Sequence, residues 1–316
     1  MKSNPIFTRS FYVNAALALA ASVLVVSSPA RAEQEQRFGT SDEAIKALTA
    51  AAVNKDTNAL EVIFGPCLRE LISADPVQAS NGLATFSRRM SEKVVPERES
   101  DSKIVLQVGL DAWPFAIPLV QAEGQWYFDT AAGREEVLNR RIGRNELDTI
   151  SVCHAYVQAQ RDYAGEDRMG TQVLEYAQHL RSTPGTHDGL YWHAEAGEEV
   201  SPLGPLVAQA RGEGYRHESK IMTEEQVPYH GYYFKILTRQ GSSAPGGKYN
   251  YIINGHMIGG FALVAWPAEW GNSGVMTFIV NQQDKVCQKN LGPKTDGIAR
   301  AMKCYDPGPG WKPAEE

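Results

Sequence analysis

Seven histidines are the side chains of this chain best suited to acid–base or metal chemistry: His154, His179, His187, His193, His217, His230 and His256. Their spacing matches neither H-E-x-x-H nor another recognised zinc pattern. His187, Asp188 and His193 come close together in a turn-rich stretch, where a loop metal site could form. Loop histidines are more often simply exposed to solvent. We therefore predict no metal and no cofactor.

Two short serine motifs resemble nucleophile sites. The first, Gly271-Asn272-Ser273-Gly274, lacks the G-x-S-x-G spacing and lies between two predicted strands instead of before a helix. The second, Ser100-Asp101-Ser102-Lys103, satisfies S-x-x-K, but no S-D-N or K-T-G accompanies it. We interpret both as chance matches.

A hydrolase acting on envelope carbohydrate or peptide is the alternative function that the sequence permits. Asp188 and Glu269 would supply carboxylates, and His230 would serve as the acid or base. This mechanism requires the three side chains to converge in one cleft. We favour a non-enzymatic protein and keep the hydrolase as the alternative.

Aromatic and polar side chains gather near the predicted strand ends of the second half. They form our candidate ligand-binding or partner-binding set, which comprises Asp188, Tyr191, Trp192, Tyr229, His230, Trp266, Glu269 and Trp270. Tyr and Trp in loops suit stacking on sugars or a protein interface. The alternative, which is the commoner role of such residues, is packing in the irregular half of a domain.

The elements that must position these residues fall into two α+β groups. In the first group, apolar periodicity predicts helices from a cap at Ser41 to residue 52, over 57–64 and over 76–93. Alternating strands follow at 103–110, 113–120 and 125–129. This order resembles the NTF2-like, cystatin-like architecture. Its aromatic lining, expected to be a filled core, is Trp113, Phe115, Trp126 and Phe128.

The second group begins at a joint. A helix over 130–142 should end at Gly143, and a second helix over 145–164 should begin with Asn145 as its N-cap, Asp148 in its first turn and Leu147 on its apolar face. Helices at 171–180, 203–211 and 295–302 accompany strands at 231–239, 249–253, 257–266, 275–281 and 285–289. Asn254-Gly255 predicts a tight hairpin. A long helix packed on an antiparallel meander is similar to a pseudopilin head, although this helix carries too many charges to be a membrane stalk.

These patterns divide the chain into residues 1–32, 33–143 and 144–316. The first segment reads as a signal peptide, with Lys2 and Arg9 before an apolar run at 15–26 and an A-x-A site at Ala30-Arg31-Ala32. Cleavage after about Ala32 would place the mature protein in the periplasm, with no transmembrane segment. It would remove three cations and change the formal net charge from −6 to −9. Such an acidic balance argues against binding nucleic acid.

Four cysteines in an exported chain suggest disulfides. Cys287 and Cys304 flank a short predicted helix, so we pair them first; Cys67 with Cys153 follows only by elimination. Free buried thiols are the alternative, because connectivity cannot be read from sequence.

Long runs of sequence, among them AWPFAIPLV, WYFDTAAGREEVLNRRIGRNEL, LEYAQHLRSTPGTHDGLYW, YHGYYFKILTRQG and MIGGFALVAWPAEWGNSGVMTFIVN, resemble an exported bacterial family. That family is known only as domain of unknown function 2950. The resemblance covers nearly the whole mature chain and implies an exported two-part protein, without an activity to transfer. Our leading hypothesis is a binding module whose second domain contacts an envelope protein or glycan.

Export makes a direct prediction about the N-terminus. When the full-length gene is expressed with an active secretion pathway, intact-mass analysis of the periplasmic product should give a chain that begins near Glu33. A product that retains Met1 and its apolar run would contradict the cleavage.

Overall fold

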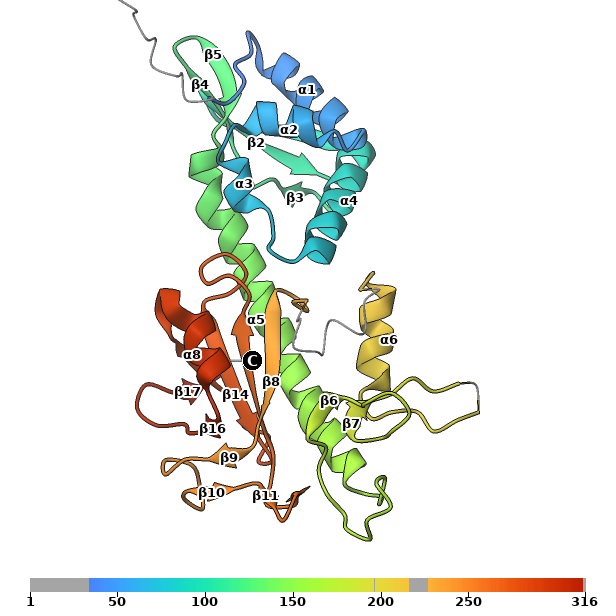
Figure 1. Ribbon diagram of the computed structural model, residues 1–316. Helices are drawn as coiled ribbons and strands as arrows, with labels where there is room; N and C mark the ends of the chain where they lie inside the picture. Colours follow the sequence, from blue (N-terminus) through green and yellow to red (C-terminus); the bar gives the residue numbers. More distant parts are fainter. Residues whose placement is uncertain (1–33, 196, 216–226, 315–316) are drawn as a thin grey trace, which may run out of the picture. The chain divides into compact units, whose positions relative to one another are not determined.

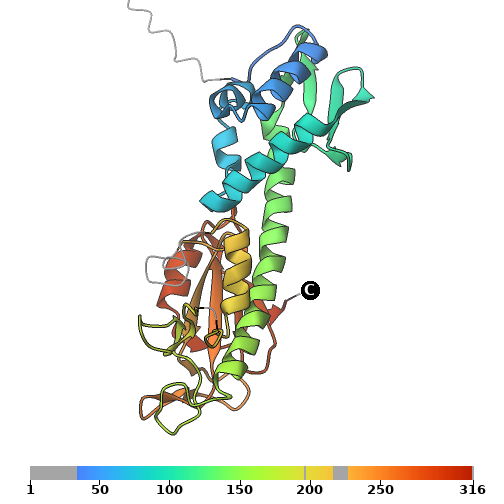
Figure 2. The same cartoon turned by 90° about the vertical axis from the view of Figure 1, so that its right-hand side faces the viewer.

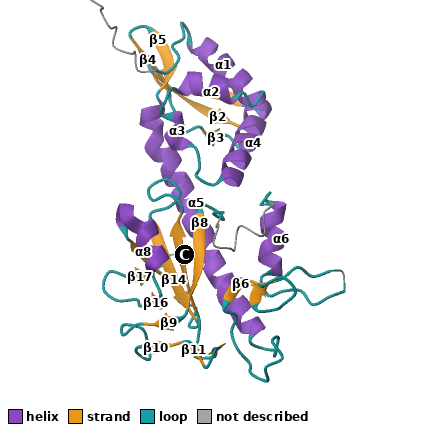
Figure 3. Cartoon of the chain, in the orientation of Figure 1, coloured by secondary structure: helices purple, strands orange, loops and turns teal. Residues whose placement is uncertain are grey.

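The computed structural model describes residues 34–195, 197–215 and 227–314. The predicted signal peptide and His217 lie outside these ranges. The described fold is mixed α+β, with helices and a five-stranded sheet in the N-terminal half, a long helix through the middle, and a second five-stranded antiparallel sheet in the C-terminal half (Figure 1 and Figure 3).

Four helices open the described chain: α1 (Ser41–Val53), α2 (Thr57–Phe64), α3 (Leu68–Leu71) and α4 (Pro76–Glu92). Side-chain caps explain where three of them begin. Thr40, not Ser41 as predicted, caps α1 in a reciprocal capping box with Glu43. Asp56 accepts from a backbone N–H of α2, and Asp75 accepts from two backbone N–H groups of α4.

A five-stranded antiparallel sheet follows, in the order β1-β2-β4-β5 with β3 paired to β2. Its strands are β1 (Val94–Ser100), β2 (Lys103–Val108), β3 (Trp113–Pro114), β4 (Leu119–Ala122) and β5 (Gln125–Phe128). The predicted middle strand is split in two, as the prolines at 114 and 118 would require. Strand β1 was not predicted, because its sequence VVPERES carries a proline and three charges. Those same residues suit an exposed edge, where they discourage pairing with another chain.

The core of the N-terminal half lies between this sheet and the helices. Trp126 and Phe128 are buried in it, as expected. Phe115 is partly buried and stacks on Phe86 at 5.2 Å between ring centroids. Trp113 departs from the prediction, since it is 36% exposed and packs beside the guanidinium of Arg89.

A single helix, α5 (Thr130–Tyr163), replaces the two helices predicted on either side of Gly143 (Figure 2). Gly143 is an exposed interior position, and Asn145 is fully buried instead of capping a helix end. An interior glycine costs only about 1 kcal/mol relative to alanine, which packing of the flanking turns readily offsets. The local stop and start signals were therefore overridden.

The C-terminal half of α5 packs on a five-stranded antiparallel sheet in the order β17-β15-β14-β13-β8. The strands are β8 (Tyr232–Leu237), β13 (Ala262–Pro267), β14 (Met276–Asn281), β15 (Cys287–Asn290) and β17 (Lys312–Pro313). Strands β14 and β15 pair antiparallel, as an antiparallel meander requires.

The buried face of α5 includes Ile150, Tyr156 and Val157, and the Tyr156 hydroxyl donates to the Ala262 carbonyl at 3.1 Å. Leu147, which was predicted on the apolar face, is 54% exposed. Among the described residues, no helix has both the length and the apolar character needed to cross a bilayer.

Smaller elements surround this sheet: β6 (His179–Arg181) beside parallel β7 (Gly189–Tyr191), α6 (Gly204–Gly212), β9 (Arg239–Gln240), β10 (Tyr249–Asn250), β11 (Ile252–Ile253), β12 (His256–Met257), the 3-10 turn η1 (Gly292–Lys294), α8 (Thr295–Ala301) and β16 (Cys304–Tyr305). The turn at Asn254-Gly255 forms as predicted, with φ of 54° and 89°.

The helix predicted over 171–180 is wrong. Residues 171–178 form a loop, because the Asp167 carboxylate binds the N–H groups of Thr171 and Gln172 and draws the chain out of helical geometry. Glu175 then fixes the loop to β12 through His256 at 2.9 Å and the Met257 N–H at 3.3 Å.

All four cysteines are free thiols, so neither predicted disulfide is present. Cys287 lies on β15 in the five-stranded C-terminal sheet, whereas Cys304 lies on β16, which pairs with β9 in a different sheet. Cys153 is fully buried in the C-terminal core, and Cys67 precedes α3 in the N-terminal half. Burial and the charge of Asp284 raise the pKa of the Cys153 thiol to about 12, which keeps it protonated. The helical periodicity that places Cys153 in the core also removes it from Cys67.

Two glycines of α5 give opposite predictions for the same substitution. A Cβ at Gly133 would lie 2.7 Å from Ile117 Cα and 2.8 Å from the Ala116 carbonyl oxygen, so Gly133→Ala should lower the free energy of unfolding by roughly 1–3 kcal/mol. A Cβ at Gly143 meets nothing within 4 Å, so Gly143→Ala should raise it by up to about 1 kcal/mol. Urea denaturation of both variants measures this. A loss of stability in Gly143→Ala would contradict a continuous helix at that point.

Candidate functional site

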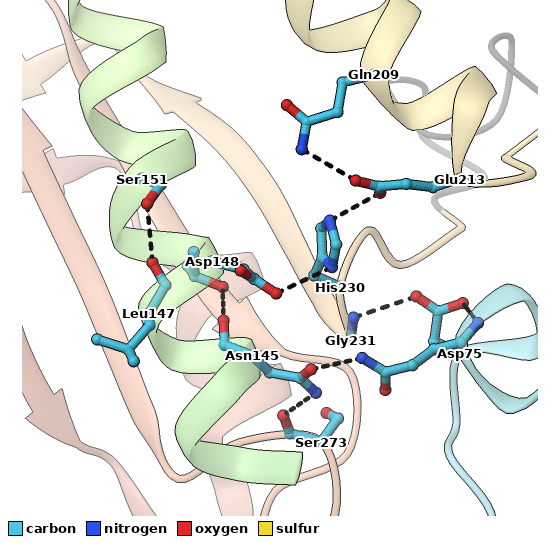
Figure 4. Close-up of polar contacts among 12 residues, drawn as sticks. Asp75, Asn145, Leu147, Asp148, Ser151, Gln209, Glu213, His230, Gly231 and Ser273 are labelled. Carbon is cyan, nitrogen blue, oxygen red and sulfur yellow. Dashed lines mark hydrogen bonds and ion pairs between the residues drawn. The ribbon is translucent and has the colours of Figure 1, made fainter. Parts of the chain in front are cut away.

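His230 lies between two carboxylates that come from different helices (Figure 4). Its Nδ1 is 3.2 Å from Asp148 Oδ2 on α5, and its Nε2 is 3.0 Å from Oε2 of Glu213, the C-cap of α6. The His230 side chain is 18% exposed. Because each ring nitrogen faces a carboxylate oxygen, each is best satisfied when it carries a hydrogen, and the arrangement therefore favours the imidazolium form.

The backbone at His230 is a tight turn. His230 has φ of 50° and Gly231 has φ of 75°, while Tyr229 and Tyr232 exchange backbone hydrogen bonds across them. Two consecutive left-handed residues make this a two-residue hairpin turn of the primed type. Gly231 is required for a second reason: a Cβ there would lie 2.7 Å from Asn145 Nδ2 and 2.9 Å from Ser273 Cβ. The turn thus presses its backbone against α5 and aims His230 at Asp148.

The electrostatics of His230 reflect two opposing effects. Burial lowers the pKa of His230, but the hydrogen bond and charge of Asp148, together with the charges of Glu213 and Asp75, raise it above its ordinary value. When both ring nitrogens carry a hydrogen, a histidine has no free ring lone pair and is a poor general base. The Asp148–His230–Glu213 group is therefore a charge clamp that joins α5, α6 and the turn before β8.

Asp75 extends the site into the N-terminal half. This fully buried carboxylate caps α4, and its Oδ2 also accepts from the Tyr215 hydroxyl at 2.6 Å and from the Gly231 N–H at 3.2 Å. Burial, followed by the hydrogen bond and charge of Asp75, raises the pKa of Tyr215, so this group remains a neutral phenol. The Tyr215 hydroxyl oxygen also accepts a hydrogen bond from the backbone N–H of His230 at 3.2 Å.

Asn145 connects the same region to α5. Its Oδ1 accepts from Gln78 Nε2 at 2.6 Å, and its Nδ2 donates to the Ser273 carbonyl at 2.8 Å. These contacts join α4, α5 and the turn before β14. We call the hydrogen-bonded set of Asp75, Gln78, Asn145, Tyr215, Gly231 and Ser273 the polar seam.

A second polar link lies beside the seam. Arg141 on α5 donates to the Leu71 carbonyl and, at 2.7 Å, to Asn272 Oδ1. Asn272 Nδ2 donates in turn to the Glu70 carbonyl at 3.0 Å. Burial lowers the pKa of Arg141, and the charge of Glu269 partly offsets this effect. The turn containing Asn272, which the sequence offered as a false nucleophile motif, thus binds the N-terminal half to the C-terminal half.

Most of the predicted aromatic binding set belongs to the core. Tyr191, Trp192, Tyr229 and Trp266 are each less than a tenth exposed, and so they cannot present a face to a partner. Trp192 donates to the Glu199 carbonyl and stacks against His187, while Trp266 donates to Asp296. These four side chains therefore pack in the core. Trp270 is 36% exposed and donates to Asn290.

The three residues of the hydrolase alternative have separate partners. Asp188 accepts from Thr183 and Thr186 within its own loop, and these hydrogen bonds contribute to a pKa below its usual value, against the opposing effect of burial. Glu269 lies near Arg141, and its backbone bonds to Ser273 Oγ. Across the described ranges, the carboxylates that pair with His230 are those of Asp148 and Glu213, and no group of three or more His, Cys, Asp or Glu is arranged to hold a metal.

Sequence reasoning singled out His230 but missed Asp75, Glu213 and Tyr215, and it assigned Asn145 a different role. The dipeptide His230-Gly231 between aromatic residues is the one local signal of the turn. The partners of the turn come from distant segments, and no spacing rule connects them.

Residues 35–314 match the model of the family described as Protein of unknown function (DUF2950). The chain belongs to this family. The DUF2950 match runs from before α1 to the end of β17, so the polar seam and both sheets lie inside the family's unit. No curated protein and no solved structure matches the chain.

The polar seam predicts a large loss of stability on removing Asp75. Asp75→Ala removes a helix cap worth about 1 kcal/mol and leaves Tyr215 and the Gly231 N–H without their buried acceptor, at about 1–3 kcal/mol each. We expect a total loss of roughly 3 kcal/mol or more in urea denaturation. Asp56→Ala is the matched control, since exposed Asp56 caps α2 and makes no seam contact; it should cost only about 1 kcal/mol. Equal losses in the two variants would show that the seam does not stabilise the fold.

Proposed function

We propose that this DUF2950 protein is an exported, non-enzymatic binding module of the cell envelope, which contacts another envelope protein through one end of its C-terminal half. The observation that carries the proposal is a group of exposed large apolar side chains on two neighbouring segments, residues 165–178 and 249–258. We call this group the apolar end; its members and exposed fractions are Met169 (42%), Leu174 (60%), Tyr249 (37%), Ile253 (46%) and Ile258 (44%).

Hydrogen bonds hold the two segments of the apolar end together. The Tyr176 N–H donates to the Met257 carbonyl at 2.8 Å, and Gln178 Nε2 donates to the Gly255 carbonyl at 2.7 Å. The His256–Glu175 pair adds a further link. In Figure 1 and Figure 2 both segments lie at the end of the C-terminal half where α5 terminates. Single exposed apolar residues need no explanation, but several on bonded segments favour an interaction surface.

The side-chain chemistry supports a protein partner over a glycan. Sugars are recognised by stacking on aromatic faces, and four of the five members of the apolar end are aliphatic or thioether side chains. Leu, Ile and Met instead pack against apolar groups of another protein, and Met adapts easily to a partner's surface.

The domain division and fold likeness also stand as proposals. Two separate hydrophobic cores, one built from residues of α1 to β5 and one from α5 and the later elements, support two domains with a boundary near Gly143 inside α5. We propose that the first is a variant of the NTF2-like cone and the second a soluble relative of a pseudopilin head. The helices against the β1–β5 sheet and the packing of α5 on the β13–β15 meander support these assignments.

Periplasmic residence rests on the N-terminal pattern of Lys2, Arg9, the apolar run and the A-x-A site. A binding surface of aliphatic side chains is consistent with a soluble protein that meets its partner after export.

Substitution of the apolar end should abolish capture of the partner. The mature protein, immobilised and exposed to envelope extract, should retain a saturable set of proteins that the double variant Leu174→Asp, Ile253→Asp loses by at least about tenfold, since burial of each charge in an apolar contact costs well over 1.4 kcal/mol. Quantitative mass spectrometry of the eluates measures this.

The matched control is Leu110→Asp, Val62→Asp, which alters two exposed apolar residues of the N-terminal half, 79% and 59% exposed. It should capture as much as the unmodified protein. Equal capture by all three proteins, or equal loss in both double variants with circular dichroism unchanged, would rule out the apolar end as the binding surface.

A further inference from the structure

We propose that His230 is a proton-operated latch, which holds the C-terminal end of α6 against α5 when the imidazole is charged and releases it when the imidazole is neutral. The latch is built from the Asp148–His230–Glu213 clamp. It is independent of the proposed binding at the apolar end, which lies on other segments of the C-terminal half.

The attachment of α6 explains why the clamp can act as a latch. At the C-terminal end of α6, Glu213 pairs with His230 through its side chain, and its backbone carbonyl accepts from Asn81 Nδ2 at 2.8 Å. Gln209 Nε2 orients the same carboxylate at 2.9 Å. Between these points and the start of the helix, α6 buries Val207 and Ala210, and Leu206 packs partly buried against the same core. The C-terminal end of α6 is held by these polar contacts of Glu213.

The charges around His230 make its protonation state decisive. Among the residues that the structure describes, the ionisable side chains that face it from the elements packed against it are the carboxylates of Asp148 on α5, Glu213 after α6 and Asp75 before α4, together with the phenols of Tyr215 and Tyr229. Burial and nearby carboxylates raise the pKa values of both phenols, so they stay neutral. A charged imidazole offsets the carboxylates; a neutral one leaves Asp148 and Glu213 to compete for a single ring N–H.

The direction of the response follows from the raised pKa of His230. An unfolded histidine titrates near pH 6.5. A group whose folded pKa lies above that value contributes stability that is fully present below about pH 6.5 and is lost as pH rises through the folded pKa. The latch is therefore closed in mildly acidic conditions and opens toward alkaline pH.

Release of α6 would uncover apolar surface. A cavity of about 20 Å³ lies beneath the start of α6 and beside the turn, and its apolar lining includes Leu203, Leu206, Tyr229 and Leu263. Leu206 belongs to α6, and Tyr229 directly precedes His230. When the imidazole loses its proton and α6 is released, Leu206 moves away from the cavity. Deprotonation of His230 therefore exposes apolar surface as well as breaking one ion pair.

Hydrogen exchange of the mature protein between pH 6 and pH 9, corrected for intrinsic chemical exchange, tests the latch. Peptides that cover residues 204–215 should lose protection by at least roughly tenfold across this range, equivalent to about 1.4 kcal/mol. In His230→Asn, which keeps the left-handed turn because asparagine tolerates positive φ, the same peptides should exchange rapidly at every pH. His256→Gln, which breaks a similar pair with Glu175 away from α6, should retain the pH dependence of the unmodified protein.

A proton NMR titration of the unmodified protein gives a second measurement that does not depend on any variant folding. The His230 resonance should titrate above the ordinary histidine range, and its midpoint should coincide with the loss of protection in α6. A pKa at or below the ordinary value, or protection of residues 204–215 that does not change with pH, would overturn the proposal.

Discussion

The amide of Asn145 is the contact on which the arrangement of this protein depends. It lies fully buried in the middle of α5, where it accepts from Gln78 of the N-terminal half and donates to the Ser273 carbonyl of the C-terminal half. Burial of an amide without partners is costly. Both partners must therefore reach α5 at one rotation and one height of the helix. A single side chain thus couples the positions of segments that are far apart in the sequence.

The neighbouring contacts make this constraint directional. An apolar contact between two halves can slide with little loss, whereas hydrogen bonds weaken steeply when their angles change. The Asp75 carboxylate accepts hydrogen bonds from Tyr215 and Gly231, and the Arg141 guanidinium donates to Leu71 and Asn272. These hydrogen bonds would break if the two halves shifted. Gly143 lies two residues from Asn145 and would otherwise be the weakest point of α5. The polar seam therefore contacts α5 next to its least stable position, where these hydrogen bonds stabilise the helix.

Sequence patterns predicted the elements whose causes are local. Apolar periodicity located α1 and α4, and Asn254-Gly255 located a hairpin, because spacing and turn chemistry act within a few residues. The same reasoning failed where distant contacts decide. Asparagine is a residue type favoured at helix caps. The hydrogen-bond partners of Asn145 lie 67 and 128 residues away, however, and their hydrogen bonds keep it inside one helix. The burial of Tyr191, Trp192 and Trp266 was not predicted for a related reason, since residue type alone does not distinguish an exposed stacking face from a core position.

The candidate site shows why residue type cannot identify a catalytic histidine. A histidine beside one carboxylate keeps a ring lone pair and can accept a proton from a substrate. Nδ1 of His230 faces Asp148, and a histidine with one carboxylate partner is the usual arrangement of an acid–base pair. Glu213 on the other nitrogen changes the chemistry, because the second carboxylate stabilises the imidazolium and occupies the position that a substrate would need. Glu213 reaches that position only because α6 ends beside the turn at Gly231. The number of acceptors around the ring, which is a property of the fold, therefore favours the charged form of His230.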